Sequence, residues 1–250
     1  ALRLHRTRAR LVLDLHDYLP SRTGRAKLHL SSHLYDRVIS VSRFSAHQAA
    51  RRVPVSVLVR PVDPVPTPVA RDERSEDLGL TPTVGIIGRL DPDKNVELAL
   101  RAAALMPQVR FRIVGSPSPG IEHYAARLHD AASSLPNVEL VPRVPQASLY
   151  ESIDILLVTN HHEPMGRVVL EAQLRGIPVV APNRGGSWEL VDGVPACQVY
   201  RAKDVGSVVR ALERAQTAAP EAIDIMRDRA ARRSDPARYA ASYLAACGVT

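Results

Sequence analysis

Two basic side chains, Arg89 and Lys94, lie five residues apart in the segment GRLDPDKN, which follows an apolar run and precedes a helical pattern. A loop of this length can bring a planar guanidinium and a compact ammonium to one anion, a combination that suits a diphosphate. Asp91 and Asp93 in the same loop leave open the alternative that the loop neutralises its own charges. The segment, which begins at Gly88, is therefore a candidate diphosphate site.

A second group of residues with suitable chemistry lies in the run EPMGRVVLE. Gly166 precedes a helical pattern, so the backbone N–H groups of Met165, Gly166 and Arg167 lie at a helix N-terminus, which attracts anions. The carboxylates of Glu163 and Glu171 can accept hydrogen bonds from the hydroxyls of a sugar or a ribose. An ordinary surface glutamate of a helix is the alternative for Glu171.

Paired glycines and a histidine complete the candidates. Gly185 and Gly186, followed by Ser187, come after an apolar run, and such a pair either lets the backbone approach a ligand or makes a tight turn. His16 follows the run RLVLDL and can present an imidazole at the mouth of a cleft, although a single histidine is often without function. The histidine pair at 161–162 lacks the spacing of metal ligands, so no metal site is predicted.

The hydrophobic pattern predicts the elements that must position these residues. After residue 82, apolar runs alternate with helical patterns, which indicates βαβ units in a doubly wound parallel sheet. The expected strands are 83–88, 109–115, 138–142, 153–159 and 177–182, and the expected helices are 95–106, 121–135, 146–152 and 166–176. Since ligands bind at the carboxyl ends of parallel strands, we expect the candidate loops to meet at one edge.

The first sixty residues predict a smaller α/β unit. The expected strands are 10–15, 37–42 and 55–60, and the expected helices are 25–35 and a second one from Ser42 or Ser45 to about Arg52. Four prolines between Pro61 and Pro68 are incompatible with a helix or a strand ladder and mark a domain boundary.

Composition excludes several classes of protein. With 45% hydrophobic and 24% charged residues among 250, the chain is typical of a globular protein with a buried core. No apolar run approaches the ~20 residues of a membrane-spanning helix. Cys197 and Cys247 have no metal or redox spacing and are interpreted as reduced thiols of a cytosolic protein.

Charge is concentrated at the start of the chain. Residues 1–60 hold 12 Lys and Arg against 3 Asp, whereas the other 190 residues hold 21 basic and 23 acidic residues. This pattern suits a nucleotide diphosphate or an anionic membrane surface, and a solvated arginine-rich surface is the alternative. Nucleic acid is not expected as a partner, because only 4% of residues are aromatic and no recognition motif is present.

The run EPMGRVVLEAQLRGIPVVAPNRGGSWELVDG resembles the donor-binding signature of the GT-B glycosyltransferases, specifically the retaining family 4, or group 1. That signature has two glutamates separated by seven residues, then a strand of the type Gly-x-Pro-Val-Val-Ala and a Gly-Gly-x-x-Glu turn. The segments GRLDPDKN and IVGS resemble two upstream elements of the family. The resemblance covers residues 83 to about 200, and Met165 stands where the family prefers Phe.

The resemblance implies roles for the candidate residues. Arg89 and Lys94 would neutralise the departing diphosphate, Glu171 would hold the ribose, and Glu163 would bind a hydroxyl of the donor sugar. The amides of residues 165–167 and 185–187 would line the sugar and the phosphates. Arg143 and Val144 would lie along the base, and His16 would face the sugar from the acceptor side.

The resemblance also implies a domain organisation. We expect a partial N-terminal, acceptor-side α/β domain at 1–62, a proline-rich linker at 63–82, a Rossmann-like nucleotide-sugar-binding domain at 83–235, and a C-terminal helix at 236–250 that returns toward the first domain. Family members are longer, with more of the acceptor domain ahead of the position of His16. We therefore expect the first domain to be completed by residues outside this sequence, in the same protein or in a second chain.

The implied activity is transfer of a sugar from a UDP- or GDP-sugar to a hydroxyl with retention, without a metal or other cofactor. The acceptor would be a carbohydrate, a lipid-linked molecule or a small molecule. We expect the protein in the cytoplasm, with peripheral contact to the inner membrane face left open. Two alternatives also stay open: a non-catalytic or split nucleotide-sugar-binding fragment, and a sugar-nucleotide epimerase of the same fold.

Overall fold

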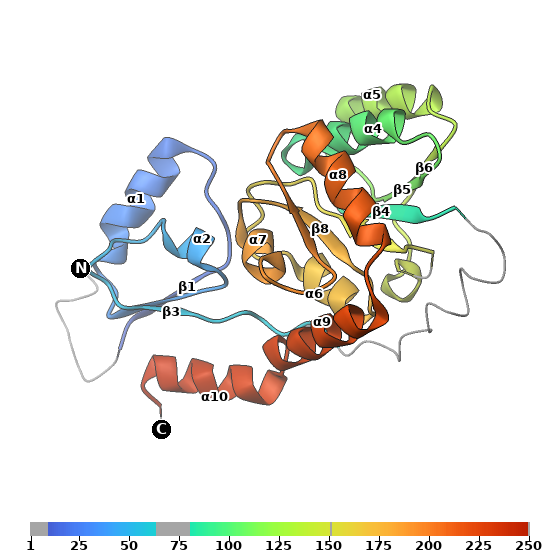
Figure 1. The fold of residues 1–250 in the computed structure, drawn as a ribbon. Coiled ribbons are helices and arrows are strands. Elements are labelled where there is room, and N and C mark those ends of the chain that lie inside the picture. Colours follow the sequence, from blue (N-terminus) through green and yellow to red (C-terminus); the bar gives the residue numbers. More distant parts are fainter. Residues whose placement is uncertain (1–9, 64–80, 151, 250) are drawn as a thin grey trace.

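The computed structural model describes residues 10–63, 81–150 and 152–249, which form two sheets flanked by helices (Figure 1). The smaller sheet has the strand order β1-β2-β3, and the larger sheet has the order β6-β5-β4-β7-β8-β9. Every strand pairing in both sheets is parallel. The predicted α/β class with a doubly wound parallel sheet is confirmed.

The smaller unit contains strands and helices close to the predicted positions. Its elements are β1 (Val12–Leu15), α1 (Arg22–Ser32), β2 (Arg37–Ser40), α2 (Arg43–Ala46) and β3 (Val55–Val57). Helix α1 begins earlier than the predicted residue 25, because the Ser21 hydroxyl accepts the Gly24 amide and caps the first turn.

Helix α2 is much shorter than the predicted helix that extends to about Arg52. It ends at Ala46, and the chain beyond it bonds to neighbouring elements instead of continuing the helix. The Gln48 side chain donates to the Asp17 carbonyl, and the Ala50 amide donates to the Ser32 hydroxyl. These tertiary hydrogen bonds override the local helical pattern.

The larger unit extends beyond the elements that the sequence pattern indicated. The predicted part comprises β4 (Thr83–Ile87), α4 (Val96–Leu105), β5 (Arg110–Val114), α5 (Glu122–Ser133), β6 (Val138–Val141), β7 (Ile155–Leu157), α6 (Arg167–Leu174) and β8 (Val179–Pro182). Where a helix was predicted at 146–152, the structure has only the three-residue 3₁₀ turn η2 (Gln146–Ser148), which follows Pro145. Four further elements were not predicted: α7 (Gly186–Val191), β9 (Gln198–Tyr200), α8 (Val205–Gln216) and α9 (Pro220–Arg233). The 3₁₀ turn η1 (Pro92–Lys94) precedes α4.

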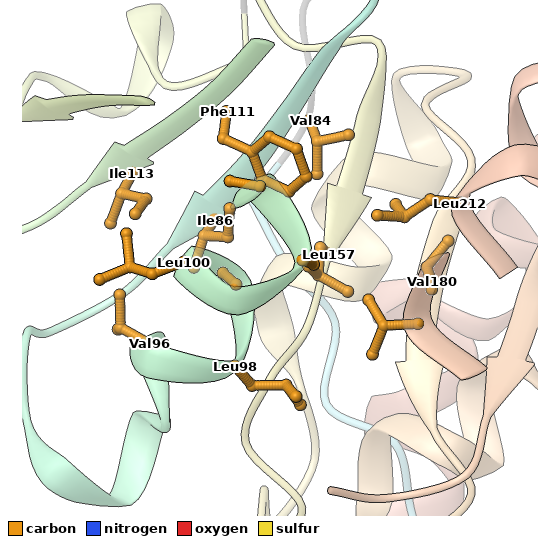
Figure 2. Packing of buried hydrophobic residues seen from close by; sticks show 14 of the residues in the cluster. Val84, Ile86, Val96, Leu98, Leu100, Phe111, Ile113, Leu157, Val180 and Leu212 are labelled. Atoms are coloured by element: carbon orange, nitrogen blue, oxygen red, sulfur yellow. The ribbon is translucent and has the colours of Figure 1, made fainter. Parts of the chain in front are cut away.

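Two hydrophobic clusters cover the two faces of the larger sheet. Val84 and Ile86, two residues apart in β4, lie on one face with Leu98 of α4 and Leu212 of α8 (Figure 2). Leu156 of β7 belongs to the cluster on the other face, with residues of α6, α7 and α9. Because side chains alternate along a strand, a strand buried on both faces is a continuous apolar run, which is why these strands were predictable.

The C-terminal helices connect the two units. Helix α9 packs against α6, and α10 (Pro236–Cys247) lies along the smaller sheet, where it contacts β2 (Figure 1). The Tyr243 hydroxyl donates to the Asp14 carboxylate at 3.2 Å. Residues 1–9 of the basic segment and 64–80 of the predicted linker lie outside the described residues, and the predicted domain limits stay predictions. No helix among the described residues is long and apolar enough to cross a membrane.

Candidate active site

A cavity of about 1060 Å³ lies between the two units, at the carboxyl ends of their strands. Its size is that of a site for a substrate larger than a single sugar. It brings together eight of the candidate residues, one from the smaller unit and seven from two loops of the larger one. These are His16, Gly88, Arg89, Lys94, Glu163, Met165, Gly166 and Arg167.

Lys94 and Glu163 form the centre of this cavity. The Lys94 ammonium lies 2.9 Å from a Glu163 carboxylate oxygen, which also accepts from the Asn160 amide at 3.0 Å. The Lys94 carbonyl accepts from the Thr159 hydroxyl at 2.5 Å. This contact fastens the loop before α4 to the end of the neighbouring strand, so the ammonium is positioned by two loops at once.

Arg89 lines the same cavity but is already paired. Its guanidinium lies 2.7 Å from Asp91 and donates to the Ser118 hydroxyl at 2.8 Å. Asp91 is 5% exposed and also accepts from the Ser118 amide and hydroxyl. The alternative left open by the sequence, a loop that neutralises its own charge, therefore describes Arg89 in this structure, whereas Lys94 pairs with an acid of a different loop.

The N-terminus of α6 faces the cavity with free donors. Gly166 has a φ of 94°, a left-handed conformation suited to glycine, and no side chain caps the helix. The backbone N–H groups of Met165, Gly166 and Arg167 have no acceptor among the described residues. Free amides at the positive end of a helix form an anion site, as predicted from this segment.

Glu171 lies outside the lining of the cavity. It is 6% exposed and accepts a hydrogen bond from the buried Tyr150 hydroxyl at 2.7 Å. Burial and the Glu171 carboxylate raise the pKa of Tyr150, so this hydroxyl stays protonated and donates. The Arg167 guanidinium lies 3.8 Å from the other Glu171 oxygen. The structure thus gives Glu171 a structural partner, and its contact with a ribose stays a prediction.

The paired glycines allow a close contact between two loops. The Gly186 amide donates to the Glu163 carbonyl at 2.7 Å, so it is not free to bind a phosphate. A Cβ on Gly185, whose φ is 89°, would lie 3.2 Å from the same carbonyl. Both glycines line a second cavity of about 710 Å³, and Ser187 is fully buried. The glycines thus let two loops pack closely, and the predicted contact of the Gly185 and Ser187 amides with the sugar and phosphates stays a prediction.

Arg143 and Val144 follow β6 and do not line the main cavity either. The Arg143 side chain is exposed, and its amide donates weakly to the Ser116 hydroxyl at 3.4 Å. Their predicted position along a base stays a prediction.

His16 contacts Asp14 and Arg60, two residues that were not predicted as part of the site. Its Nε2 lies 3.0 Å from an Asp14 carboxylate oxygen and 2.8 Å from the Arg60 guanidinium. Asp14 and His16 are two residues apart at the end of a strand, a spacing that puts both side chains on one face. That spacing was the available signal. Because Nε2 is occupied, Nδ1 is the ring nitrogen left for a ligand.

An aromatic stack that was not predicted from the sequence lies beside the cavity, which two of its members, Tyr18 and His162, line. The Tyr18 ring stacks on Phe44, with centroids 4.7 Å apart, and on His162, with centroids 5.3 Å apart and planes 8° apart. Tyr18 and Phe44 belong to the smaller unit and His162 to the larger one. Burial, and then the charges of Arg184, Lys203 and Arg25, lower the pKa of His162. The folded protein therefore disfavours a charge on this imidazole.

Potential metal ligands are not clustered in the described part of the chain. No three His, Cys, Asp or Glu side chains of residues 10–63, 81–150 and 152–249 are grouped as ligands of a metal ion. The two cysteines are both free.

Comparison with known proteins identifies the family of this chain. The sequence profile of the family described as Glycosyl transferases group 1 matches residues 81–217, more than half of the chain. The chain therefore belongs to the glycosyl transferases group 1 family, as its resemblance indicated.

The curated relatives match about half of this chain. The D-inositol 3-phosphate glycosyltransferase of Mycolicibacterium gilvum is 38% identical over 144 residues, which cover 54% of this chain and 33% of that protein. The protein of the same name from Mycobacterium leprae is 36% identical over 124 residues, 47% of this chain and 29% of the relative. The matched region thus spans about a third of the length of these relatives.

Solved structures share the arrangement of both units. HepE from Anabaena, in complex with UDP and glucose, superposes with a TM-score of 0.78 and 22% identity, over 96% of this chain and 71% of that one. Sucrose-phosphate synthase from Thermosynechococcus elongatus gives a TM-score of 0.74 and 21% identity, over 90% and 62% of the two chains. The fold is that of the GT-B glycosyltransferases, which confirms the expected fold class.

Proposed function

We propose that this chain carries the donor site, and one wall of the acceptor site, of an enzyme that transfers a sugar with retention from a nucleotide-diphosphate donor to an acceptor hydroxyl. The observation that carries the proposal is the convergence of the Lys94 ammonium and the free amides of residues 165–167 on one cavity. Together they offer a fixed positive charge and oriented dipoles where a leaving diphosphate develops negative charge.

The geometry supports a specific order of contacts. In the absence of a ligand Lys94 is neutralised by Glu163. A bound diphosphate competes with Glu163 for the ammonium. The released Glu163 carboxylate can then accept a hydrogen bond from a hydroxyl of the donor sugar. Cations and dipoles then do what Mg²⁺ does in other sites, so we propose transfer without a metal. The bond from the anomeric carbon to the phosphate oxygen breaks, and the acceptor oxygen bonds to that carbon from the same face, which retains the configuration. The departing phosphate oxygen takes the proton of the acceptor hydroxyl.

UDP is the first donor nucleotide to test, because the HepE structures hold UDP and UDP-glucose; GDP is the second. Near His16 the cavity is lined by Arg25, Arg60 and Arg184 and by the acid Asp17, and Arg60 also lies 3.4 Å from the Asp14 carboxylate. We propose an acceptor that carries a negative group, since the curated relatives are named for a phosphorylated inositol.

A thermal-shift screen of UDP, GDP and ADP and their hexose conjugates tests the proposal. We expect one nucleotide to raise the midpoint of unfolding, because ligands that bind only the folded state stabilise it. With that donor isotopically labelled, release of the nucleotide together with a glycoside of unchanged anomeric configuration supports transfer. An isomerised donor would indicate an epimerase, and binding without turnover would indicate a non-catalytic fragment. No shift with any nucleotide would contradict the proposal.

Two expectations about partners stay proposals. Completion of the smaller sheet by a second chain is tested by co-purification with candidate N-terminal segments of relatives. Contact of the basic surface with an anionic membrane, as in a peripheral cytoplasmic enzyme, is tested by sedimentation with vesicles that contain or lack phosphatidylglycerol.

A further inference from the structure

Glu189, on α7 of the larger unit, caps a helix of the smaller unit. Its Oε2 accepts the Arg43 amide at 2.9 Å and its Oε1 accepts the Phe44 amide at 2.7 Å. The third amide of α2, that of Ser45, is satisfied by the Ser42 hydroxyl. The first three donors of α2 are therefore filled, two of them by a carboxylate from a residue 145 or more positions away in the chain.

A second contact lies beside the first. The Ser42 hydroxyl donates to the Pro164 carbonyl at 2.5 Å, and the Ser45 hydroxyl approaches the same carbonyl at 3.3 Å. Ser42 is 3% exposed and Ser45 is fully buried, so these bonds are shielded from water. Pro164 lies between Glu163 and Met165, inside the turn that lines the candidate active site.

The turn at Pro164 is thus held from both units. On its own side, the Gly186 amide binds the Glu163 carbonyl, at the start of the helix that carries Glu189. On the other side, Ser42 binds the Pro164 carbonyl directly. We call these contacts of Ser42, Pro164 and Glu189 the clasp. The clasp joins the wall that bears His16 to the wall that bears Glu163.

We infer that Glu189 is a positioning residue, which aligns the acceptor wall with the bound donor by capping α2 across the two units. The inference rests on the proposed transfer function. The donor contacts, Lys94 and the α6 amides, all belong to the larger unit, and Glu189 bonds to neither of them. His16 belongs to the smaller unit, and its distance from the donor depends on how the units are joined. Misplacement by about 1 Å is enough to reduce a rate about a hundredfold.

The residue type fits this role. A glutamate offers two oxygens to two adjacent amides, and its negative charge is favoured at a helix N-terminus. Glu189 forms no ion pair with a Lys, Arg or His among the described residues, so amide acceptance is what occupies its carboxylate. A glutamine keeps one acceptor oxygen and turns an NH₂ group toward the other amide, whereas an alanine removes both acceptors.

Amide hydrogen exchange tests the cap itself, without any ligand. In Glu189→Ala we expect the Arg43 and Phe44 amides to exchange about fivefold to tenfold faster, the scale of a lost N-cap. Glu189→Gln should lie between Ala and the wild type. Glu213→Ala, which removes an exposed helix glutamate of the larger unit, is the matched control and should change neither amide. Equal exchange in Glu189→Ala and the wild type would overturn the cap.

Steady-state kinetics test the alignment, with the donor found in the thermal-shift screen. We expect Glu189→Ala to lower kcat at least about tenfold while the affinity for UDP in calorimetry changes less than about threefold. Ser42→Ala should act in the same direction, and the double variant should lose less than the product of the two single effects, because both residues act through one contact. A loss of stability alone would lower the active fraction without this kinetic pattern, so thermal midpoints are measured in parallel.

The outcomes separate the two proposals. Wild-type kcat in Glu189→Ala overturns the alignment role while leaving the proposed function intact. A fall in UDP affinity that matches the fall in kcat also overturns it, because the clasp would then act on donor binding. If the wild type turns over no donor, the proposed function fails together with the alignment role, and the exchange data alone decide the cap.

Discussion

The ammonium of Lys94 lies 2.9 Å from the carboxylate of Glu163, although the two residues are 69 positions apart in the chain. Both side chains are about one-fifth to one-quarter exposed. The pair joins the loop after β4 to the loop after β7, two strands that are neighbours in the sheet. The two charges neutralise each other, and the proposed function requires that a bound diphosphate competes with Glu163 for the ammonium.

Replacement of Lys94 by alanine should remove the positive charge from this part of the cavity. We expect Lys94→Ala to lower the turnover of the nucleotide sugar at least about a hundredfold, the scale of one lost charge contact to a developing anion. Initial rates of nucleotide release measure the effect. Lys27→Ala removes an exposed lysine of α1 and should leave the rate unchanged. Wild-type transfer by Lys94→Ala would rule out the phosphate role.

Glu171 and Tyr150 allow a structural role to be separated from a binding role. Glu171→Ala leaves the buried Tyr150 hydroxyl without an acceptor, so the free energy of unfolding should fall by about 1–3 kcal/mol. If Glu171 also holds a ribose, its loss weakens UDP binding in calorimetry. Tyr150→Phe removes the hydroxyl but keeps the carboxylate, and it should leave UDP affinity unchanged. Equal UDP affinity of Glu171→Ala and the wild type would remove the ribose assignment.

Gly186 lies where any side chain would collide with the neighbouring loop. A Cβ there would overlap the Pro164 carbonyl, so Gly186→Ala must push the turn at 163–165 away from α7. We expect a loss of about 1–3 kcal/mol in urea unfolding, the usual scale of overpacking. Gly206→Ala, near the start of α8, meets only flexible or polar atoms at 3.4 Å or more and should raise stability by about 0.4–1 kcal/mol. The reverse order of the two variants would contradict this packing argument.

The histidine in the aromatic stack predicts a dependence of stability on pH. Burial, and then the charges of Arg184, Lys203 and Arg25, lower the pKa of His162 below its ordinary value of 6.5. As the pH falls below about 6.5, the unfolded chain binds a proton that the folded protein resists, so stability present above that pH is progressively lost. Urea unfolding at pH 7.5 and 5.5 measures the loss.

His162→Phe keeps a ring against Tyr18 and removes the titrating group, so its loss of stability between pH 7.5 and 5.5 should be smaller than that of the wild type. His129→Phe, at an exposed position of α5, is the control and should keep the wild-type dependence. Identical pH dependence of the wild type and His162→Phe would show that the charge on His162 is not resisted.

Much of the fold and part of the site could be predicted from local pattern. The strands of the larger sheet are buried on both faces, which makes them continuous apolar runs, and the helix at 167–174 follows a glycine that ends a loop. Glu163, Gly166 and Lys94 were identified because each lies in a loop between such a run and a helical pattern. By contrast, half of the residues of α9 are charged and only Met226 and Ala230 are buried, so its pattern is weak. Helix α8 does have a local apolar stripe, at Val208, Ala211, Leu212 and Ala215, and this signal was not used.

The contacts between the two units could not be predicted from local sequence pattern. Glu189 belonged to the Gly-Gly-x-x-Glu turn of the resemblance, and no local pattern singled out Phe44 or Tyr18. Their partners are more than a hundred positions away or on another element. The same holds for the Gly186 amide, which the pattern offered to a phosphate and the structure gives to Glu163.

The sequence by itself determined the class of the fold, the family, and which loops carry chemistry, because hydrophobic period, glycine positions and helix ends are local properties of the chain. Only the tertiary structure decided which of those groups are free and which are already bonded. That difference is physical: a carboxylate, an amide or an ammonium is available to a ligand only if no other part of the folded chain has satisfied it first, and such satisfaction comes from residues far away in sequence.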